Sequence, residues 1–332
     1  MVARRRPVST VLTALILAPL PALAQSPIAI IGGESALAGQ EIGQLGPMLV
    51  TDRHVLVFDK ADKLLRVYDL NGASVQSVGQ SGAGPGEFRF VYAMARDSAG
   101  HVLLLDPATG RVTTYIEGDT LRLLGTRPIE LSGYGLCTTG DTLFVSGSQG
   151  SGMVHQFELG ARAGRALRSF GKSQLRGSLG QNQMIRERLG NSPIACVPGE
   201  PVVMPGSRDL GVIQIMRTDM QDERVVALPG FERMTITPGN GSLTFGVPES
   251  GHYDMLVTMR PARGGAIAIV HRVTGRTNDS IEYRRYFITA TGAVQLLGKS
   301  AWHQIGAGRG KVYCAGENPF PEVVVFQGVA CP

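Results

Sequence analysis

The sequence has few lysines and, after its first 24 residues, no long apolar run. Only five of its 32 basic residues are Lys, and they form no cluster with the arginines. A surface that binds nucleic acid needs a basic stripe, so the charge pattern gives no reason to expect a nucleic-acid partner. A membrane-spanning helix needs about 20 predominantly apolar residues. We therefore expect no transmembrane helix in the mature chain.

The common motifs of catalysis and metal binding are also missing. No two of the six His residues stand at a metal-ligand spacing, and no Gly-x-Ser-x-Gly nucleophile elbow occurs. Gly82–Gly86 is glycine-rich, but Pro85 and a following strand replace the helix whose amides would bind phosphate. His54 and His101 precede equivalent strands and are expected at exposed turns. We predict no catalytic residue, no metal and no cofactor.

One short apolar pattern occurs six times along the chain. The copies are separated by 41 to 65 residues, which is typical of repeat architectures. They begin at Val55, Val102, Leu143, Val202, Ile267 and Val312. The second repeat shows four strand-length segments separated by Asp, Gly and Pro residues. We predict an all-β fold, a six-bladed β-propeller of four-stranded antiparallel blades, in a single domain over residues 25–332.

Ring closure follows from the position of the fourth strands. Five repeats have a fourth-strand segment, but the chain stops at Pro332 soon after the third strand of the last repeat, Glu322–Phe326. A matching segment, Ile28–Gly32, stands near the N-terminus. Because an open ring would leave an unpaired sheet edge, we predict that this N-terminal strand completes the last blade.

Two insertions account for the longest spacings, at about residues 172–190 and 234–253. Both lie between the fourth strand of one blade and the first strand of the next, so they emerge on the same face of a propeller. Insertions confined to one face of a repeat protein usually mark its binding surface.

Ser81–Phe88, with the sequence Ser-Gly-Ala-Gly-Pro-Gly-Glu-Phe, resembles the connector of NHL-repeat and related bacterial six-bladed β-propellers. Arg96–Tyr115 is similar to the repeat core of that family. The resemblance covers roughly residues 47–125. It implies the propeller fold without implying an activity, because that architecture serves binding modules, lyases and lactonases.

Residues 1–24 have the features of a secretory signal peptide: basic Arg4–Arg6, apolar Val11–Leu20 and a small-residue cleavage site ending at Ala24. An uncleaved membrane anchor is the alternative, although Pro19 interrupts a run already too short to span a bilayer. We expect an extracytoplasmic protein, periplasmic or secreted. Cleavage would change the formal net charge from +5 to +2.

The four cysteines fit an oxidising compartment. Cys137 and Cys196 occupy equivalent places in the first strands of neighbouring blades, so we predict that they form a disulfide. Cys314 and Cys331 would then pair beside the ring closure. Buried free thiols are the alternative, and a zinc site is disfavoured because no two cysteines have the close spacing of zinc ribbons.

Exposed aromatic and arginine side chains are enriched in protein interfaces. The candidate binding residues on the predicted insertion-bearing face are Phe88, Arg89, Phe90, Tyr92, Arg176, Arg186, Arg188, Tyr253, Trp302 and His303. For Phe88 and Trp302 the alternative is packing between blades.

These features favour an exported, non-enzymatic module that binds or scaffolds a protein or cell-envelope partner. One alternative is a metal-dependent, lactonase-like hydrolase or lyase at the channel mouth, with loop ligands such as Glu249, His252 or Asp254. A second alternative is an accessory subunit of a membrane complex, held by a retained N-terminal segment.

Overall fold

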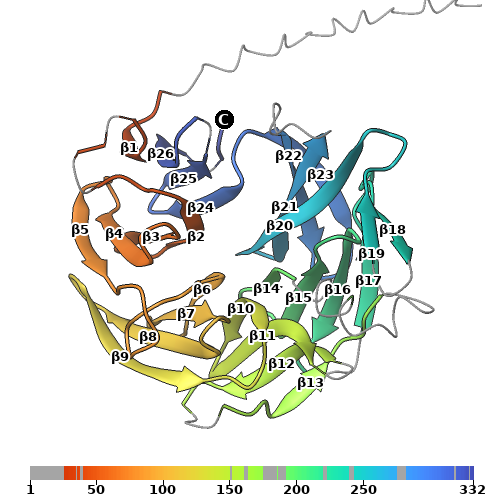
Figure 1. Cartoon of the computed structure of the whole chain (residues 1–332), viewed down its shortest axis with the longest axis horizontal. Helices are drawn as coiled ribbons and strands as arrows, with labels where there is room; N and C mark the ends of the chain where they lie inside the picture. The colour runs from red at the N-terminus through yellow and green to blue at the C-terminus, as the bar shows by residue number, and fades with distance from the viewer. Residues whose placement is uncertain are drawn as a thin grey trace, which may run out of the picture.

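The computed structural model describes residues 26–332 except 35, 38–39, 150–151, 161–163, 175–184, 186–191, 220–222, 239–242, 275–281, 318 and 329. The predicted signal peptide lies outside the described residues. Across the described residues 26 β-strands form six four-stranded sheets and one two-stranded sheet. The six larger sheets are arranged as blades around a central axis (Figure 1). The chain is therefore a six-bladed β-propeller, as the repeat pattern predicts.

Each blade is an antiparallel sheet whose innermost strand comes first. Blade 1 consists of β2 (Leu45–Val50), β3 (His54–Asp59), β4 (Leu64–Asp69) and β5 (Ser74–Val78). Blade 2 consists of β6 (Ala93–Arg96), β7 (Val102–Asp106), β8 (Arg111–Glu117) and β9 (Leu121–Pro128). Blade 3 consists of β10 (Gly133–Thr139), β11 (Thr142–Gln149), β12 (Gly152–Glu158) and β13 (Arg168–Phe170). Blade 4 consists of β14 (Ile194–Cys196), β15 (Val202–Ser207), β16 (Val212–Arg217) and β17 (Glu223–Ala227). Blade 5 consists of β20 (His252–Ala262), β21 (Gly265–Thr274), β22 (Glu282–Thr289) and β23 (Val294–Ser300). Blade 6 consists of β24 (Gln304–Gly308), β25 (Lys311–Gly316), β26 (Glu322–Gln327) and, as its fourth strand, β1 (Ala29–Gly32).

The position of a strand in its blade explains its sequence. Second strands lie between neighbouring blades, and all six residues of β3 and all five of β7 are buried. A strand covered on both faces needs a continuous apolar run, which is the repeated signal in the sequence. Fourth strands form the outer edge and are more exposed, as β5 and β17 show. This is why they carry a weaker apolar pattern.

The N-terminal strand closes the ring. β1 pairs antiparallel with β26, with Ala29 opposite Val325 and Ile31 opposite Val323. The buried side chain of Ile31 packs in a cluster with Val55 of blade 1 and Val323 of blade 6. The last blade therefore contains strands from both ends of the chain, which confirms the predicted closure.

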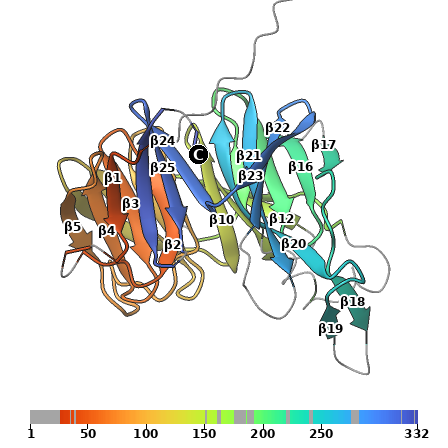
Figure 2. The ribbon, with the colours of Figure 1, turned by 90° about the horizontal axis from the view of Figure 1, so that it is seen from above.

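The two faces of the ring differ. We call the face on which fourth strands connect to the next first strands the insertion face, and the face at which β1 begins and β26 ends the terminal face. A hairpin of β18 (Thr235–Pro238) and β19 (Leu243–Gly246) lies between β17 and β20 and projects from the insertion face (Figure 2). This hairpin falls within the insertion predicted at 234–253. The insertion predicted at 172–190 lies largely outside the described residues.

Both predicted disulfides are present. Cys137 and Cys196 join the first strands of blades 3 and 4, with their Cα atoms 5.6 Å apart. Cys314 of β25 is bonded to Cys331, with a Cα separation of 6.0 Å, and fixes the C-terminal segment to the closing blade. No described cysteine is a free thiol.

The Ser81–Phe88 connector is held by its own side chains. Glu87 accepts a hydrogen bond of 2.6 Å from the Gly84 amide and one of 2.7 Å from the Gln80 side chain. The ring of Phe88 is fully buried and meets Phe58 edge to face at 5.6 Å. Gly79 has a φ of +92°, and a β-carbon there would lie 2.4 Å from the Phe88 ring. The connector therefore anchors blade 2 to blade 1.

We predict that truncating Ile31 destabilises the protein far more than truncating its neighbour. Ile31 is 2% exposed and Ile30 is 48% exposed. Ile31→Ala should lower the free energy of unfolding by about 2–5 kcal/mol, because it opens a cavity between the closing blade and blade 1. Ile30→Ala should cost less than about 0.5 kcal/mol. Urea unfolding measures both, and equal losses would contradict the packing of β1.

Candidate functional site

A cavity of about 320 Å³ lies on the central axis and is lined by the first strands of all six blades. Its volume is at the small end of the range for ligand pockets, about 300–1,000 Å³. The walls are mostly aliphatic, formed by Met48, Leu49, Met94, Leu136, Ile194, Leu256, Met259 and Ile305. Ser192, Thr258 and Gln304 add polar groups. The propeller therefore provides a concave, largely apolar site at its centre.

Aromatic side chains lie at the insertion-face end of this cavity. The rings of Phe90 and Tyr92 are 4.6 Å apart between centroids, and Tyr92 meets Tyr134 edge to face at 5.1 Å. The ammonium group of Lys63 lies 5.6 Å from the Phe90 ring centroid, within cation–π range. Tyr92 and Tyr134 line the cavity, and Tyr92 is 43% exposed. The pKa of the Tyr92 hydroxyl is raised above its ordinary value, because burial and the neighbouring Tyr134 outweigh the opposing effect of the nearby Arg208 charge.

Two arginines line the same cavity. Arg208, which follows β15, donates a hydrogen bond of 3.4 Å to the Met255 sulfur and lies 3.9 Å from the Asp209 carboxylate. Thioether sulfur is a weak acceptor, and 3.9 Å is too long for a hydrogen bond. Arg260, on β20, has a buried Nε that finds no acceptor among the described atoms. Burial and the nearby Arg285 lower the pKa of the Arg260 guanidinium.

The structure brings some of the predicted binding residues to this site and places others elsewhere. Tyr92 lines the channel mouth with Phe90 against it, and Arg89, the residue before Phe90 in the chain, is exposed. The interpretation of Phe88 as a surface residue is wrong, because its ring is fully buried between blades 1 and 2. Arg176, Arg186 and Arg188 lie outside the described residues.

The candidates on blades 5 and 6 are half-buried. Tyr253 pairs with Val273 near the start of β20. Trp302 lies 6.4 Å from the ring of Phe326 and packs against a cluster of residues from blades 5 and 6, so it packs between blades. His303 lies 5.8 Å from the Tyr283 ring, which in turn lies 4.9 Å from His271. Burial, together with the nearby Lys60 and His271, lowers the pKa of His303 to about 4, so this imidazole is neutral near pH 7.

Tyr134, Arg208 and Arg260 line the cavity but do not belong to the predicted set. The sequence does contain a signal for Tyr134, since it stands at the start of a first strand, as Tyr92 does. Arg208 and Arg260 resemble many other arginines in this chain. Only the curvature of the ring brings them to one cavity.

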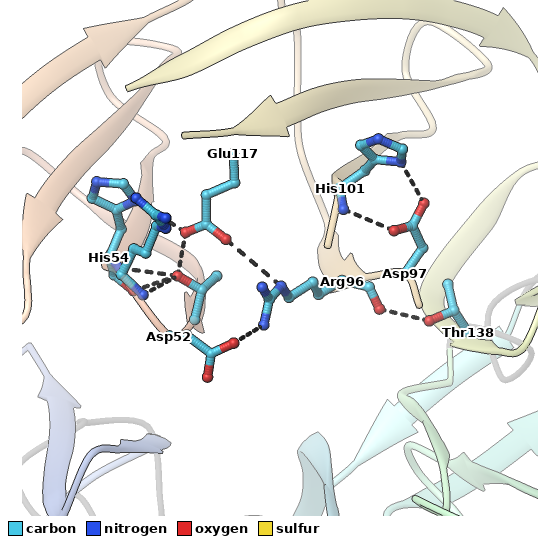
Figure 3. Close-up of polar contacts among 9 residues, drawn as sticks. Asp52, His54, Arg96, Asp97, His101, Glu117 and Thr138 are labelled. Atoms are coloured by element: carbon cyan, nitrogen blue, oxygen red, sulfur yellow. Dashed lines mark hydrogen bonds and ion pairs between the residues drawn. The ribbon is translucent and has the colours of Figure 1, made fainter. Parts of the chain in front are cut away.

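A polar network ties blades 1 and 2 together on the terminal face (Figure 3). Glu117 has a 2% exposed side chain at the end of β8. It accepts hydrogen bonds from the Thr51 hydroxyl and from His54 Nδ1, the latter at 3.0 Å, and its second oxygen lies 3.6 Å from Arg96 Nε. Arg96 also pairs with Asp52. The prediction of an exposed His54 is wrong, because its imidazole is buried beside Glu117.

His101 occupies the equivalent turn of blade 2. Its Nδ1 lies 2.9 Å from Asp97 Oδ2, and its amide donates to the other oxygen of Asp97 at 2.7 Å. Thr138 of blade 3 donates its hydroxyl hydrogen to the Arg96 carbonyl at 2.6 Å (Figure 3). The terminal-face carboxylates therefore hold turns and neighbouring blades in place.

The possible metal ligands of the second insertion do not converge. Asp254 is buried, and Arg272 Nε donates to it at 3.1 Å, the Glu232 amide donates at 2.8 Å and Arg284 also pairs with it. Burial raises the pKa of Asp254, but these hydrogen bonds and the arginine charges outweigh it and lower the pKa. The part of the chain that the structure describes contains no group of three or more His, Cys, Asp or Glu placed to hold a metal ion.

Comparisons with known proteins support the fold. A family model described as a 6-bladed beta-propeller matches residues 39–139. No curated protein matches the chain. Among solved structures, the WD40 repeats of RRP9 are 10% identical, with 91% of this chain and 97% of that chain covered and a TM-score of 0.57.

Two proteins of Bacteroides are similarly related. A member of the DUF4221 family from Bacteroides vulgatus is 8% identical, with 91% of this chain and 98% of that chain covered and a TM-score of 0.57. A Bacteroides fragilis protein whose name classes it as exported is 12% identical, with coverages of 92% and 95% and a TM-score of 0.56. These likenesses support the propeller fold, and the closer resemblance to NHL repeats stays a prediction.

We predict that Glu117→Ala lowers the free energy of unfolding by about 1.5–3 kcal/mol, because it leaves His54 and Thr51 without their buried charged acceptor. Glu117→Gln should cost less, since its amide oxygen can still accept from both. Asp119→Asn, at an exposed ion pair with Arg53, is the control and should leave the melting temperature unchanged. If Glu117→Ala left the free energy of unfolding unchanged, a stabilising role for this network would be contradicted.

We also predict a pH dependence that comes from His303. The folded-state pKa of about 4 lies below the ordinary value of 6.5, so the unfolded state takes up a proton first as pH falls. The stability that the neutral imidazole provides is complete above pH 6.5 and is lost as pH falls toward 4. In His303→Gln, the free energy of unfolding should depend less on pH between about 4 and 6.5, as measured by urea titrations at several pH values. A variant curve parallel to the original would refute the assignment.

Proposed function

We propose that this chain is an exported, non-enzymatic binding module that recognises a protein or cell-envelope component through its insertion face. The observation that carries the proposal is the convergence of Phe90, Tyr92 and Tyr134 around the mouth of an apolar cavity. Partly exposed aromatic side chains beside a pocket are the usual anchors of recognition sites.

Two further features support recognition on this side of the ring. The β18–β19 hairpin projects from the insertion face near the outer edge of the ring and adds to the surface of that face (Figure 2). On the terminal face, by contrast, the described charged groups at the blade 1 and blade 2 turns are largely paired with one another. A partner on the insertion face would therefore meet aromatic rings and incompletely paired cations.

The cysteine pairing supports export, because structural disulfides persist in oxidising compartments. Among the described residues no helix has the length and apolar character to cross a membrane. The proposal that the chain is exported rests on the signal-peptide features of residues 1–24. N-terminal sequencing of the mature protein tests this proposal. A mature chain that begins near Gln25 supports cleavage, and a retained Met1 favours the membrane-complex alternative.

Affinity capture from the cell-envelope fraction tests the binding role. The intact protein should retain a specific partner, and the double variant Arg89→Glu, Tyr92→Ser should lose it. Arg53→Glu, on an exposed turn of the terminal face, is the control and should retain it. A partner retained equally by all three proteins would overturn the proposed face. Stoichiometric bound metal together with a chelator-sensitive hydrolytic activity would instead favour the enzyme alternative.

A further inference from the structure

The lining of the central cavity has an unbalanced charge. Its described side chains include two cations, Arg208 and Arg260, and none of them is acidic. Some buried or half-buried arginines elsewhere in the protein face carboxylates, as Arg66 faces Asp59 at 3.0 Å and Arg272 faces Asp254 at 3.1 Å. Others donate to backbone carbonyls, as Arg127 does to Glu158 at 2.6 Å. Arg260 has a buried Nε without an acceptor among the described atoms, whereas the side chain of Arg208 is 44% exposed and open to a ligand. Burying a cation without an anion is costly, so the cavity has the electrostatic character of an anion site.

The geometry of the mouth places hydrogen-bond donors together. Arg208 and Tyr134 both lie within electrostatic range of the Tyr92 hydroxyl, and all three residues line the cavity. Among the described atoms, Arg208 has one weak sulfur acceptor and a loose contact with Asp209 for its five N–H donors. Two phenol hydroxyls and a guanidinium can together bind the oxygens of one anionic head group.

Below this cluster of donors the walls are aliphatic. Met48, Met94 and Met259 contribute three of the lining side chains, and methionine adapts its shape to unbranched apolar ligands. The volume of about 320 Å³ limits the apolar body to a short chain. A free inorganic anion would leave these walls unused. An uncharged alkane would leave Arg260 Nε without an acceptor and Arg208 with only its two weak contacts.

We propose that the central channel binds a short-chain amphiphilic anion, with its anionic head held by Arg208, Tyr92 and Tyr134 and its aliphatic chain inside the cavity. Arg260 adds a second positive charge to the wall of the same cavity. The inference rests on the proposed binding function of the insertion face and names the chemistry of its ligand. A component of the cell envelope that carries an acyl chain with an anionic end would fit both the proposed binding function and the proposed ligand chemistry.

Isothermal titration of the purified full chain tests the inference. Octanoate and octyl sulfate, used below their micelle concentrations, distinguish a carboxylate head from a sulfate head, and 1-octanol lacks the charge. At least one anion should bind at least ten times more tightly than 1-octanol. Arg208→Gln should weaken the binding of that anion at least tenfold, and Tyr92→Phe should weaken its binding by a smaller factor. Arg263→Gln, on an exposed turn of the terminal face, is the matched control and should bind like the original protein.

Melting curves show whether each variant is folded, and Arg208→Lys is the second variant if Arg208→Gln is unstable. Failure of both anions to bind would overturn the inference, as would binding that neither Arg208 variant changes. If neither anion binds while capture of the envelope partner still depends on Arg89 and Tyr92, the anion site is wrong and the proposed binding function stands. If the anions bind through Arg208 but capture does not depend on the insertion face, the anion site stands and the proposed partner surface falls.

Discussion

The pairing of β1 with β26 is the constraint on which the rest of the structure depends. Only this pairing gives the last blade its fourth strand, and it does so with residues from opposite ends of the chain. A ring without it would expose the edge of β26 and the apolar cluster around Ile31. Because the central cavity takes part of its lining from every blade, its shape exists only while the ring is closed.

Acidic side chains have a structural role in much of this ring, and their placement explains the electrostatics of the channel. Asp59 accepts hydrogen bonds from the Gly43 and Gln44 amides, and Asp106 accepts one from the Arg89 amide. Both carboxylates therefore fix the chain where it enters a blade from the insertion face. With these acids directed at backbone and neighbouring arginines, the lining of the central cavity is left with positive charge.

The fold was predictable because its signals are local and repeated. Buried second strands must be apolar throughout, so runs such as Val102–Leu105 identify the blades, and a missing fourth strand beside Glu322–Phe326 identifies the closure. The disulfide between Cys137 and Cys196 followed from equivalent positions in neighbouring repeats.

The site was less predictable, because it depends on which side chains the ring brings together. Phe88 and Phe90 are two residues apart between β5 and β6, yet Phe88 is buried in the core and Phe90 packs against Tyr92 at the channel mouth. Position in the repeat gave no sign that His54 would be covered by Glu117, because Glu117 belongs to the next blade and is 63 residues away in the sequence. Arg208 reaches the cavity from blade 4, while Tyr92 and Tyr134 reach it from blades 2 and 3.

Hydrogen exchange of the backbone amides in residues 28–32 tests the closure most directly. In a closed ring the alternate amides of β1 that face β26, those of Ala29 and Ile31, are protected as strongly as the amides of β25 and β26 and exchange only when the whole ring unfolds. The amides of Ile30 and Gly32 face away from β26 on this edge strand and are expected to exchange faster. The amide of Ile28, which donates to the Val325 carbonyl at 2.8 Å, should share the protection of Ala29 and Ile31. Exchange of these three amides at the rate of an unpaired tail, with β25 still protected, would contradict a ring closed by the N-terminal strand.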